Sequence, residues 1–347
     1  METGLFTEFH CPPGTSEATA FENSMTQMKA AETLGYDAVW LAELHFQKDR
    51  SVLSSPLVVA GALAAATRRI KIGIAVQVLP LSNPIRIAED AATVDNLSGG
   101  RLDFGVGRSG LPAHYRGFNI PYAESRDRFN EALDIILKAW TEDRFSYSGK
   151  YHQLQDVCVM PKPMQKPHPP LRIAATNAET FEMVGRLGYP LFIAVRTFGA
   201  EELKRLISGY HAGWKAAGHA GRGDVALSIP VYVAETEARV RADSETSTMH
   251  FFHSIARGLQ QQDGASAATS QARAERAQKL ASLTYEDVTR NYAIYGTPQS
   301  VTEQLCALRD ALGFSTISAW MNCGAQIAND RVLNSMRLFA EQVAPRL

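Results

Sequence analysis

Two histidines that follow predicted strands are candidates for acid–base chemistry. The first lies in Glu43-Leu44-His45-Phe46, and the second is His10 near the N-terminus. Because a histidine titrates near neutral pH, His45 and His10 are candidate catalytic acids or bases. His45 can equally be a hydrogen-bonded structural histidine that orients its loop. Both interpretations stay open at the level of sequence.

A second group of residues can bind an anion. Arg108 ends a short apolar run, and Thr176-Asn177 precede a predicted helix that starts at Ala178. An arginine is a permanent planar cation, and the amides at a helix N-terminus attract negative charge. The alternative is a surface ion pair at Arg108 and a helix cap at Asn177, and the cap is compatible with anion binding.

Several other chemistries have no support in the sequence. The segment GRLDFGVG lacks the third glycine and the strand-then-helix placement of a dinucleotide fingerprint, and Gly-x-Ser-x-Gly is absent. No metal site is expected, because no cluster of His, Cys, Asp and Glu has ligand spacing. His114 and Tyr115 are expected in a loop, where they either reach the mouth of the barrel or are exposed without a chemical role. Arg196 either meets an anionic substrate or forms a local ion pair.

Eight short apolar runs alternate with segments of helical periodicity. This alternation predicts βα units around a parallel sheet, and eight strands are enough to close a TIM (β/α)8 barrel, a fold of the α/β class. The carboxyl ends of barrel strands meet at one mouth, which is where the candidate residues above fall. The predicted strands are Leu5–Phe9, Ala38–Glu43, Ile70–Val78, Leu102–Gly107, Leu171–Ala175, Leu191–Val195, Val225–Val233 and Ser315–Met321.

Residues 1–347 are expected to form a single barrel domain with two interruptions. Residues 145–170 are predicted to be a hairpin-like insertion followed by a proline-rich connector. Residues 258–277 contain almost no large apolar side chain, and we expect a mobile or disordered loop there. Glycines predict helix ends at Gly35, Gly99 and Gly188.

Charge and composition narrow the class of protein. The 347 residues carry 35 Lys and Arg against 36 Asp and Glu, so a nucleic-acid partner is not expected. The longest apolar run, Leu57 to Ala66, is about half as long as a bilayer span requires, so no membrane partner is expected. We expect the protein to be located in the cytoplasm. Four widely separated cysteines favour reduced thiols over a disulfide framework.

Taken together, three segments resemble the bacterial luciferase-like flavin monooxygenases. They are VWLAELHF at residues 39–46, IKIGIAVQVLPLSNPIRIAEDAATVDNLSGGRLDFGVGR at 70–108, and YGTPQSVTEQL at 295–305. Their order and spacing carry the resemblance, which is reinforced by LRIAATNAETFEMVGRLGYP at 171–190 and covers essentially the whole chain.

The resemblance implies a flavin-dependent oxygenase. Such enzymes take reduced FMN from a separate flavin reductase, and O₂ then forms a C4a-peroxyflavin that oxygenates a small organic substrate. A homodimer is also implied, with the run around Glu89, Asp90 and Asp95 packing a helix on the barrel exterior and Arg101 closing an ion-pair network.

The same resemblance assigns cofactor-binding residues. It implies a non-proline cis peptide at Ala75-Val76 against the flavin ring, and phosphate binding by Arg108, Thr176 and Asn177. Gly107 is expected to leave a strand end free of side chain, so that a ring can approach.

One position departs from the luciferase pattern. Leu44 stands where luciferases carry the histidine assigned as catalytic base, so light emission is not expected, and the group that replaces it is not identified. Two alternatives therefore remain: a deazaflavin-dependent dehydrogenase on the same barrel, and a non-catalytic flavin-binding or partner subunit. The substrate is not specified by the sequence.

Overall fold

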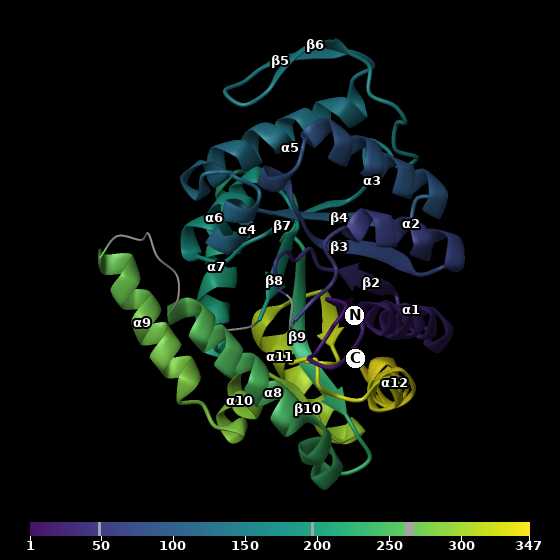
Figure 1. The fold of residues 1–347 in the computed structure, drawn as a ribbon, viewed down its shortest axis with the longest axis vertical. Helices are drawn as coiled ribbons and strands as arrows, with labels where there is room; N and C mark the ends of the chain where they lie inside the picture. Colours follow the sequence, from purple (N-terminus) through teal and green to yellow (C-terminus); the bar gives the residue numbers. More distant parts are fainter. Residues whose placement is uncertain (48–49, 196–197, 261–266) are drawn as a thin grey trace.

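Eight parallel strands close into a barrel in the computed structural model, which describes residues 1–47, 50–195, 198–260 and 267–347. Strand β9 pairs with both β8 and β11, and β11 pairs with β1, which closes the ring (Figure 1). The predicted TIM barrel is confirmed. Around the ring the strands are β1 Glu2–Thr7, β2 Ala38–Leu41, β3 Lys71–Val78, β4 Leu102–Gly107, β7 Leu171–Ala174, β8 Leu191–Ala194, β9 Val225–Val233 and β11 Thr316–Trp320.

The first strand begins three residues earlier than predicted and ends two residues earlier. The apolar letters favoured Leu5–Phe9, but β1 covers Glu2–Thr7, and Phe9 has a φ of 52°, which ends the extended conformation. The strand starts early because the polar residue Thr3 has a partner at the end of the next connection. Its main-chain N–H and its hydroxyl both donate to the Asp37 carboxylate, at 2.8 and 3.0 Å.

Helices connect successive strands and cover the barrel (Figure 1). Gly35, Gly99 and Gly188 end their helices in the left-handed conformation, as predicted. The helices are α1 Glu17–Leu34, α2 Pro56–Ala66, α3 Pro84–Ser98, α4 Pro112–Gly117, α5 Ser125–Thr141, α6 Ala178–Leu187, α7 Ala200–Ala216, α8 Glu237–Gln260, α9 Ala267–Ala281, α10 Tyr285–Asn291, α11 Pro298–Leu312 and α12 Asn329–Leu338. Short 3₁₀ turns at Leu79–Leu81, Tyr122–Glu124 and Ala344–Arg346, and a π turn at Phe339–Val343, complete the list.

Residues 145–170 form the predicted insertion. Strands β5 Phe145–Ser148 and β6 Gln153–Val157 pair as an antiparallel hairpin at the top of Figure 1, beyond α5. A further strand, β10 Ile294–Gly296, was not predicted. It is only three residues long and pairs in parallel with the last residues of β9, Val231 to Val233.

The sequence predicted a loop at residues 258–277, but the described residues of this segment are helical. Helix α8 continues to Gln260 and α9 begins at Ala267, while residues 261–266 lie outside the described residues. The segment is rich in Ala and Gln, which are good helix formers. Helix α9 packs beside α8 (Figure 1) and buries Ala277 and, just beyond the segment, Leu280, so the helix gains apolar contacts that the composition of residues 258–277 did not indicate.

Arg101 is structural, but not in the way predicted. Its guanidinium donates to main-chain carbonyls of Ala64, Thr67, Ile70 and Ser98 and so caps the end of α2, rather than closing an ion-pair network. Glu89 and Asp90 pair with Arg86 on the exposed face of α3. Among the helices of the described residues, none combines the length and the apolar character needed to cross a bilayer.

Candidate functional site

The carboxyl ends of the strands bring the predicted site residues to one mouth of the barrel. Within this mouth the residues fall into three neighbouring groups. One group surrounds Glu43 and His45 after β2. The second lines a cavity between β4 and β7, and the third lines a cavity between β1, β11 and α8.

Glu43 is a buried carboxylate that receives three hydrogen bonds. Gln77 Nε2 donates to Oε2 at 2.5 Å, the Val78 main-chain N–H donates to the same oxygen at 2.8 Å, and His45 Nε2 lies 2.8 Å from Oε1. Because a carboxylate accepts, this contact places the proton on Nε2 of His45. Glu43 therefore joins the end of β3 to the loop after β2 and fixes the orientation of the His45 ring.

His114 packs against His45 inside the molecule. The two rings meet edge to face with centroids 5.5 Å apart, and His114 Nδ1 lies 3.2 Å from Ser109 Oγ. Burial lowers the pKa of His114 to about 4, and the nearby His45 and Arg50 act in the same direction. His114 is thus neutral at pH 7, and it is buried in the short helix α4 rather than in the loop that the sequence predicted.

The second group lines a cavity of about 240 Å³ between β4 and β7, the Arg108 cavity. Arg108, Thr176 and Asn177 line it together with Val76 and Gly107, so the predicted residues do converge. Asn177 caps α6, since its Oδ1 accepts from the Thr180 main-chain N–H at 3.0 Å. The amides at this helix start therefore border the cavity, and the predicted cap is confirmed.

The Arg108 guanidinium forms a hydrogen bond to a neutral group, so its positive charge is available to a ligand in this cavity. Its Nη1 donates to Ser125 Oγ at 2.9 Å, and its carbonyl accepts from the Tyr115 hydroxyl. Within the described part of the chain no carboxylate pairs with Arg108, so the surface ion pair considered as its alternative role is not observed. Arg126, which lines the same cavity, differs because it pairs with Glu179 at 2.7 Å.

The peptide between Ala75 and Val76 is cis, as predicted. Both residues are partly exposed at the end of β3, and Val76 lines the Arg108 cavity. Gly107 borders the Arg108 cavity and also has a packing role. A Cβ at Gly107 would lie 2.5 Å from Val76 Cγ2, so the glycine makes room for Val76 in addition to bordering the cavity.

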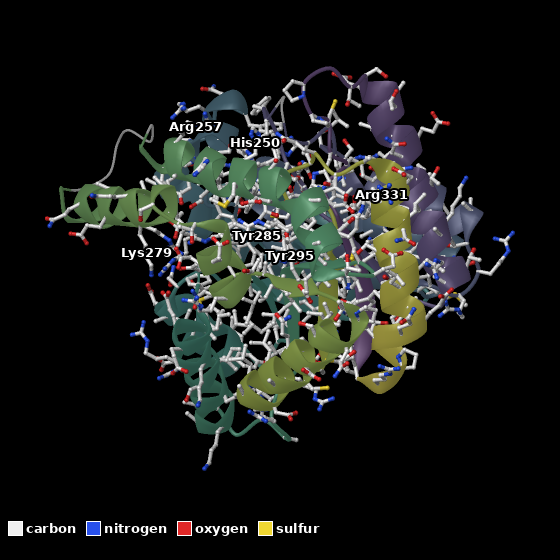
Figure 2. All side chains as sticks on the ribbon, turned by 90° about the horizontal axis from the view of Figure 1, so that it is seen from below. His250, Arg257, Lys279, Tyr285, Tyr295 and Arg331 are labelled. Atoms are coloured by element: carbon white, nitrogen blue, oxygen red, sulfur yellow. The ribbon has the colours of Figure 1, made fainter. Side chains whose placement is uncertain are left out.

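The third group lines a cavity of about 280 Å³, the Arg257 cavity. Helix α8 contributes His250 and Arg257, which are labelled in Figure 2. Phe251 of the same helix and Trp320 of β11 also line the cavity. His10 lines this cavity as well. Its Nε2 accepts from Trp320 Nε1 at 3.0 Å, and the two rings stack with centroids 5.9 Å apart.

These geometries agree with the comparison to known sequences. A profile of the family described as luciferase-like monooxygenase matches residues 1–316. The chain belongs to the luciferase-like monooxygenase family. The resemblance drawn from the sequence motifs is therefore confirmed.

Individual relatives are more distant. An uncharacterised protein of Sinorhizobium fredii, y4vJ, is 35% identical over 54% of this chain, and the chain spans about half (53%) of its length. The oxygenase component of a flavin-dependent trigonelline monooxygenase from Acinetobacter baylyi is 24% identical over 94% of this chain and 89% of its own. The oxygenating constituent of 3,6-diketocamphane monooxygenase from Pseudomonas putida, solved with FMN, shares the fold with a TM-score of 0.84, 21% identity, and coverage of 100% of this chain and 98% of that one.

Two side-chain contacts in this luciferase-like protein were not predicted from the sequence. Gln77 was placed at a strand end, but nothing indicated that its side chain would reach Glu43. Glu8 was not considered at all, although it is fully buried and binds Arg50 through two hydrogen bonds. An acidic residue within an apolar stretch was the available signal, because a buried charge needs a partner. Arg196, singled out from the sequence, lies outside the described residues.

Proposed function

We propose that this chain is the oxygenase of a two-component FMN-dependent monooxygenase. Reduced FMN from a separate flavin reductase supplies two electrons, O₂ gives one oxygen atom to a small organic substrate, and the other leaves as water. The observation that carries the proposal is the Arg108 cavity. There a guanidinium that pairs with no described carboxylate, the Thr176 hydroxyl and the start of α6 meet beside β3.

The residues present fit an FMN molecule. Phosphate is a dianion, and Arg108 with the α6 N-terminus offers the donors that phosphate sites use. The Arg108 cavity, at about 240 Å³, is smaller than a whole-ligand pocket, so it suits the phosphate end. Ala75, Val76 and Gly107 offer small apolar surface for a flat ring.

The polar edge of a flavin also needs hydrogen bonds. Gln77 Oε1 is buried and has no hydrogen-bond partner in the described residues, while Gln77 Nε2 is held by Glu43. Such an unsatisfied acceptor next to β3 is costly unless a ligand or water reaches it. Its presence supports a ligand with N–H donors at this place.

His45 is the proposed proton-transfer residue, and Glu43 its positioning residue. With Nε2 donating to Glu43, the neutral ring has an acceptor at Nδ1, which can hold or release a proton during the reaction. Leu44 is buried next to it and cannot exchange protons, so it contributes only to the exclusion of water. His10, in the Arg257 cavity, is the second candidate.

The remaining parts of the proposal concern assembly. A homodimer is supported by two exposed apolar side chains, Val58 on α2 and Leu97 on α3, which are 74% and 61% exposed. Light scattering tests it, and a monomer at micromolar concentration would contradict it. We also propose that the protein works in the cytoplasm with its reductase, which cell fractionation checks.

The proposed function is tested by anaerobic titration of reduced FMN and, in parallel, of a reduced deazaflavin cofactor. We expect saturable binding of FMN and at least about tenfold weaker binding of the deazaflavin, which corresponds to about 1.4 kcal/mol. The reverse order would favour the dehydrogenase. Binding of neither would overturn the proposal.

A second measurement separates an enzyme from a passive flavin carrier. The complex with reduced FMN is mixed with oxygenated buffer, and release of hydrogen peroxide is followed in time. An oxygenase should delay peroxide release relative to free reduced FMN. Release as fast as from free FMN would indicate the non-catalytic subunit.

A further inference from the structure

The Arg257 cavity has an excess of positive charge. His250 and Arg257 lie seven residues apart on α8, which is close to two helical turns, so both can face the same side (Figure 2). Neither has a hydrogen-bond or ion-pair partner among the residues that the structure describes. Arg257 is exposed at the rim and His250 is half-buried.

Among the described residues, Glu8 is the acidic side chain that lines the Arg257 cavity, and it is already engaged. Glu8 is fully buried, and Arg50 donates to it from Nε at 2.8 Å and from Nη2 at 2.6 Å. This bidentate pair cancels one positive and one negative charge. The charge of Arg257 therefore remains uncompensated by the cavity lining, and an anionic group is the ligand chemistry that it favours.

The body of the Arg257 cavity is aromatic. Phe251 meets Trp320 edge to face, with ring centroids 4.7 Å apart, and His10 stacks on Trp320. Phe46 also lines the cavity and is 64% exposed, which is unusual for so large an apolar side chain. Flat aromatic walls with one cationic rim suit a flat ligand that carries an anionic group at one end.

The Arg257 cavity also adjoins the proposed proton-transfer residue. Phe46 is next to His45 in the chain, and the two rings are 5.9 Å apart. The loop after β2 thus has His45 held by Glu43 and Phe46 in the cavity wall. A ligand in the Arg257 cavity would therefore lie one residue from His45.

We infer that the Arg257 cavity binds the organic substrate of this oxygenase, and that the substrate is an aromatic or other flat cyclic carboxylate. The inference rests on the proposed function for the reaction itself. The binding step does not depend on flavin. Arg257 binds the carboxylate at the rim, and the aromatic walls contact the ring.

The test uses flavin-free protein and two probes of equal shape, 1-naphthoate and 1-naphthamide. Binding is followed by calorimetry. We expect naphthoate to bind at least about tenfold more tightly than the neutral amide, which is the low end for a hydrogen bond to a charged group. Equal affinity for the two probes would overturn the inference.

Substitution locates the binding site. Arg257→Gln should weaken naphthoate binding by about tenfold or more and leave naphthamide unchanged, because only the charged contact is removed. Arg290→Gln, on the exposed face of α10 and outside the cavity lining, is the matched control and should change neither. Unchanged naphthoate affinity in Arg257→Gln would contradict the inference. Arg50 is unsuitable here, because its removal leaves Glu8 buried without its arginine.

Flavin titration of the same variants separates this inference from the proposed function. Arg257→Gln should bind FMN as the unmodified protein does. If FMN binds and naphthoate does not, the substrate assignment fails alone. If naphthoate binds through Arg257 and FMN does not bind, the oxygenase proposal fails, and with it the role of the ligand as substrate.

Discussion

The Arg108 cavity and the Arg257 cavity both contain guanidinium groups, but the protein surrounds them differently. Among the described residues, the Arg108 guanidinium has a neutral hydroxyl partner, Ser125, and no paired carboxylate, and the start of α6 borders the same cavity. In the Arg257 cavity a second arginine, Arg50, is tied to a fully buried carboxylate, and the walls are aromatic. The first arrangement suits a phosphate, and the second suits a flat ligand with a single negative charge.

The two arginines also differ in their expected contributions: Arg108 to ligand binding, and Arg50 to the stability of the fold. Arg108 can be removed without leaving a buried charge behind, whereas Arg50 cannot, because Glu8 has no contact with solvent. The loop after β2 lies between the two cavities and holds His45 through Glu43. Substitutions at the two cavities and in the loop between them should therefore have different effects on binding and on stability.

Arg50→Leu should destabilise the fold the most. It leaves the Glu8 carboxylate buried without its bidentate partner, which costs about 3–5 kcal/mol in the free energy of unfolding. Urea denaturation measures the loss. The double variant with Glu8→Leu should recover at least half of it, and a loss below about 1 kcal/mol in the single variant would show that the pair is not a structural requirement.

Acidification should destabilise the protein through His114. Its pKa is about 4 in the folded state against a usual value near 6.5, so the unfolded chain binds the extra proton between these values. Stability from neutral His114 is complete above pH 6.5 and falls as the pH drops towards 4, by up to about 3 kcal/mol. His114→Gln should flatten the dependence of unfolding on pH in this window. An unchanged slope in that variant would argue against a buried neutral His114.

Arg108→Ala should weaken FMN binding without destabilising the protein. Loss of a hydrogen bond to a charged group corresponds to about 1.5–3 kcal/mol, or roughly 10- to 150-fold in Kd. Arg126→Ala is the matched control in the same cavity. Its charge is already paired with Glu179 at the surface, so the effect should be a few-fold at most. Equal effects of the two substitutions would remove Arg108 from its assigned role.

Gly107→Ala should have the smallest of these effects. A Cβ there meets Val76 at 2.5 Å, and accommodating it should cost about 1–3 kcal/mol of stability. In Gly61→Ala, within α2, the new Cβ meets nothing within 4 Å, and that control should gain about 0.5–1 kcal/mol. Thermal unfolding compares the two, and a neutral Gly107→Ala would mean that Val76 is free to move.

The sequence predicted those parts of the molecule that depend on local patterns. Continuous apolar runs placed the barrel strands, and Asn177 before Ala178 indicated the start of a helix. The convergence of Arg108 with Thr176 followed from the barrel, whose strand ends meet at one mouth. The cis peptide at Ala75-Val76 came from family resemblance, since nothing in these two residues asks for it.

The errors have a physical cause in contacts between distant segments. The buried position of His114 depends on packing against His45, 69 positions earlier, and the helix α9 depends on packing against α8. The Glu8–Arg50 pair joins two loops that only the closed barrel brings together. Composition alone misjudged residues 267–277, because alanine buries well when a neighbouring helix is present.

The most direct test of the division between the two cavities is a crystal structure of the protein with FMN. We expect the phosphate within hydrogen-bond distance of the Arg108 guanidinium and the start of α6, with the ring against Ala75 and Val76. A phosphate bound instead by Arg257 or His250 would contradict the account.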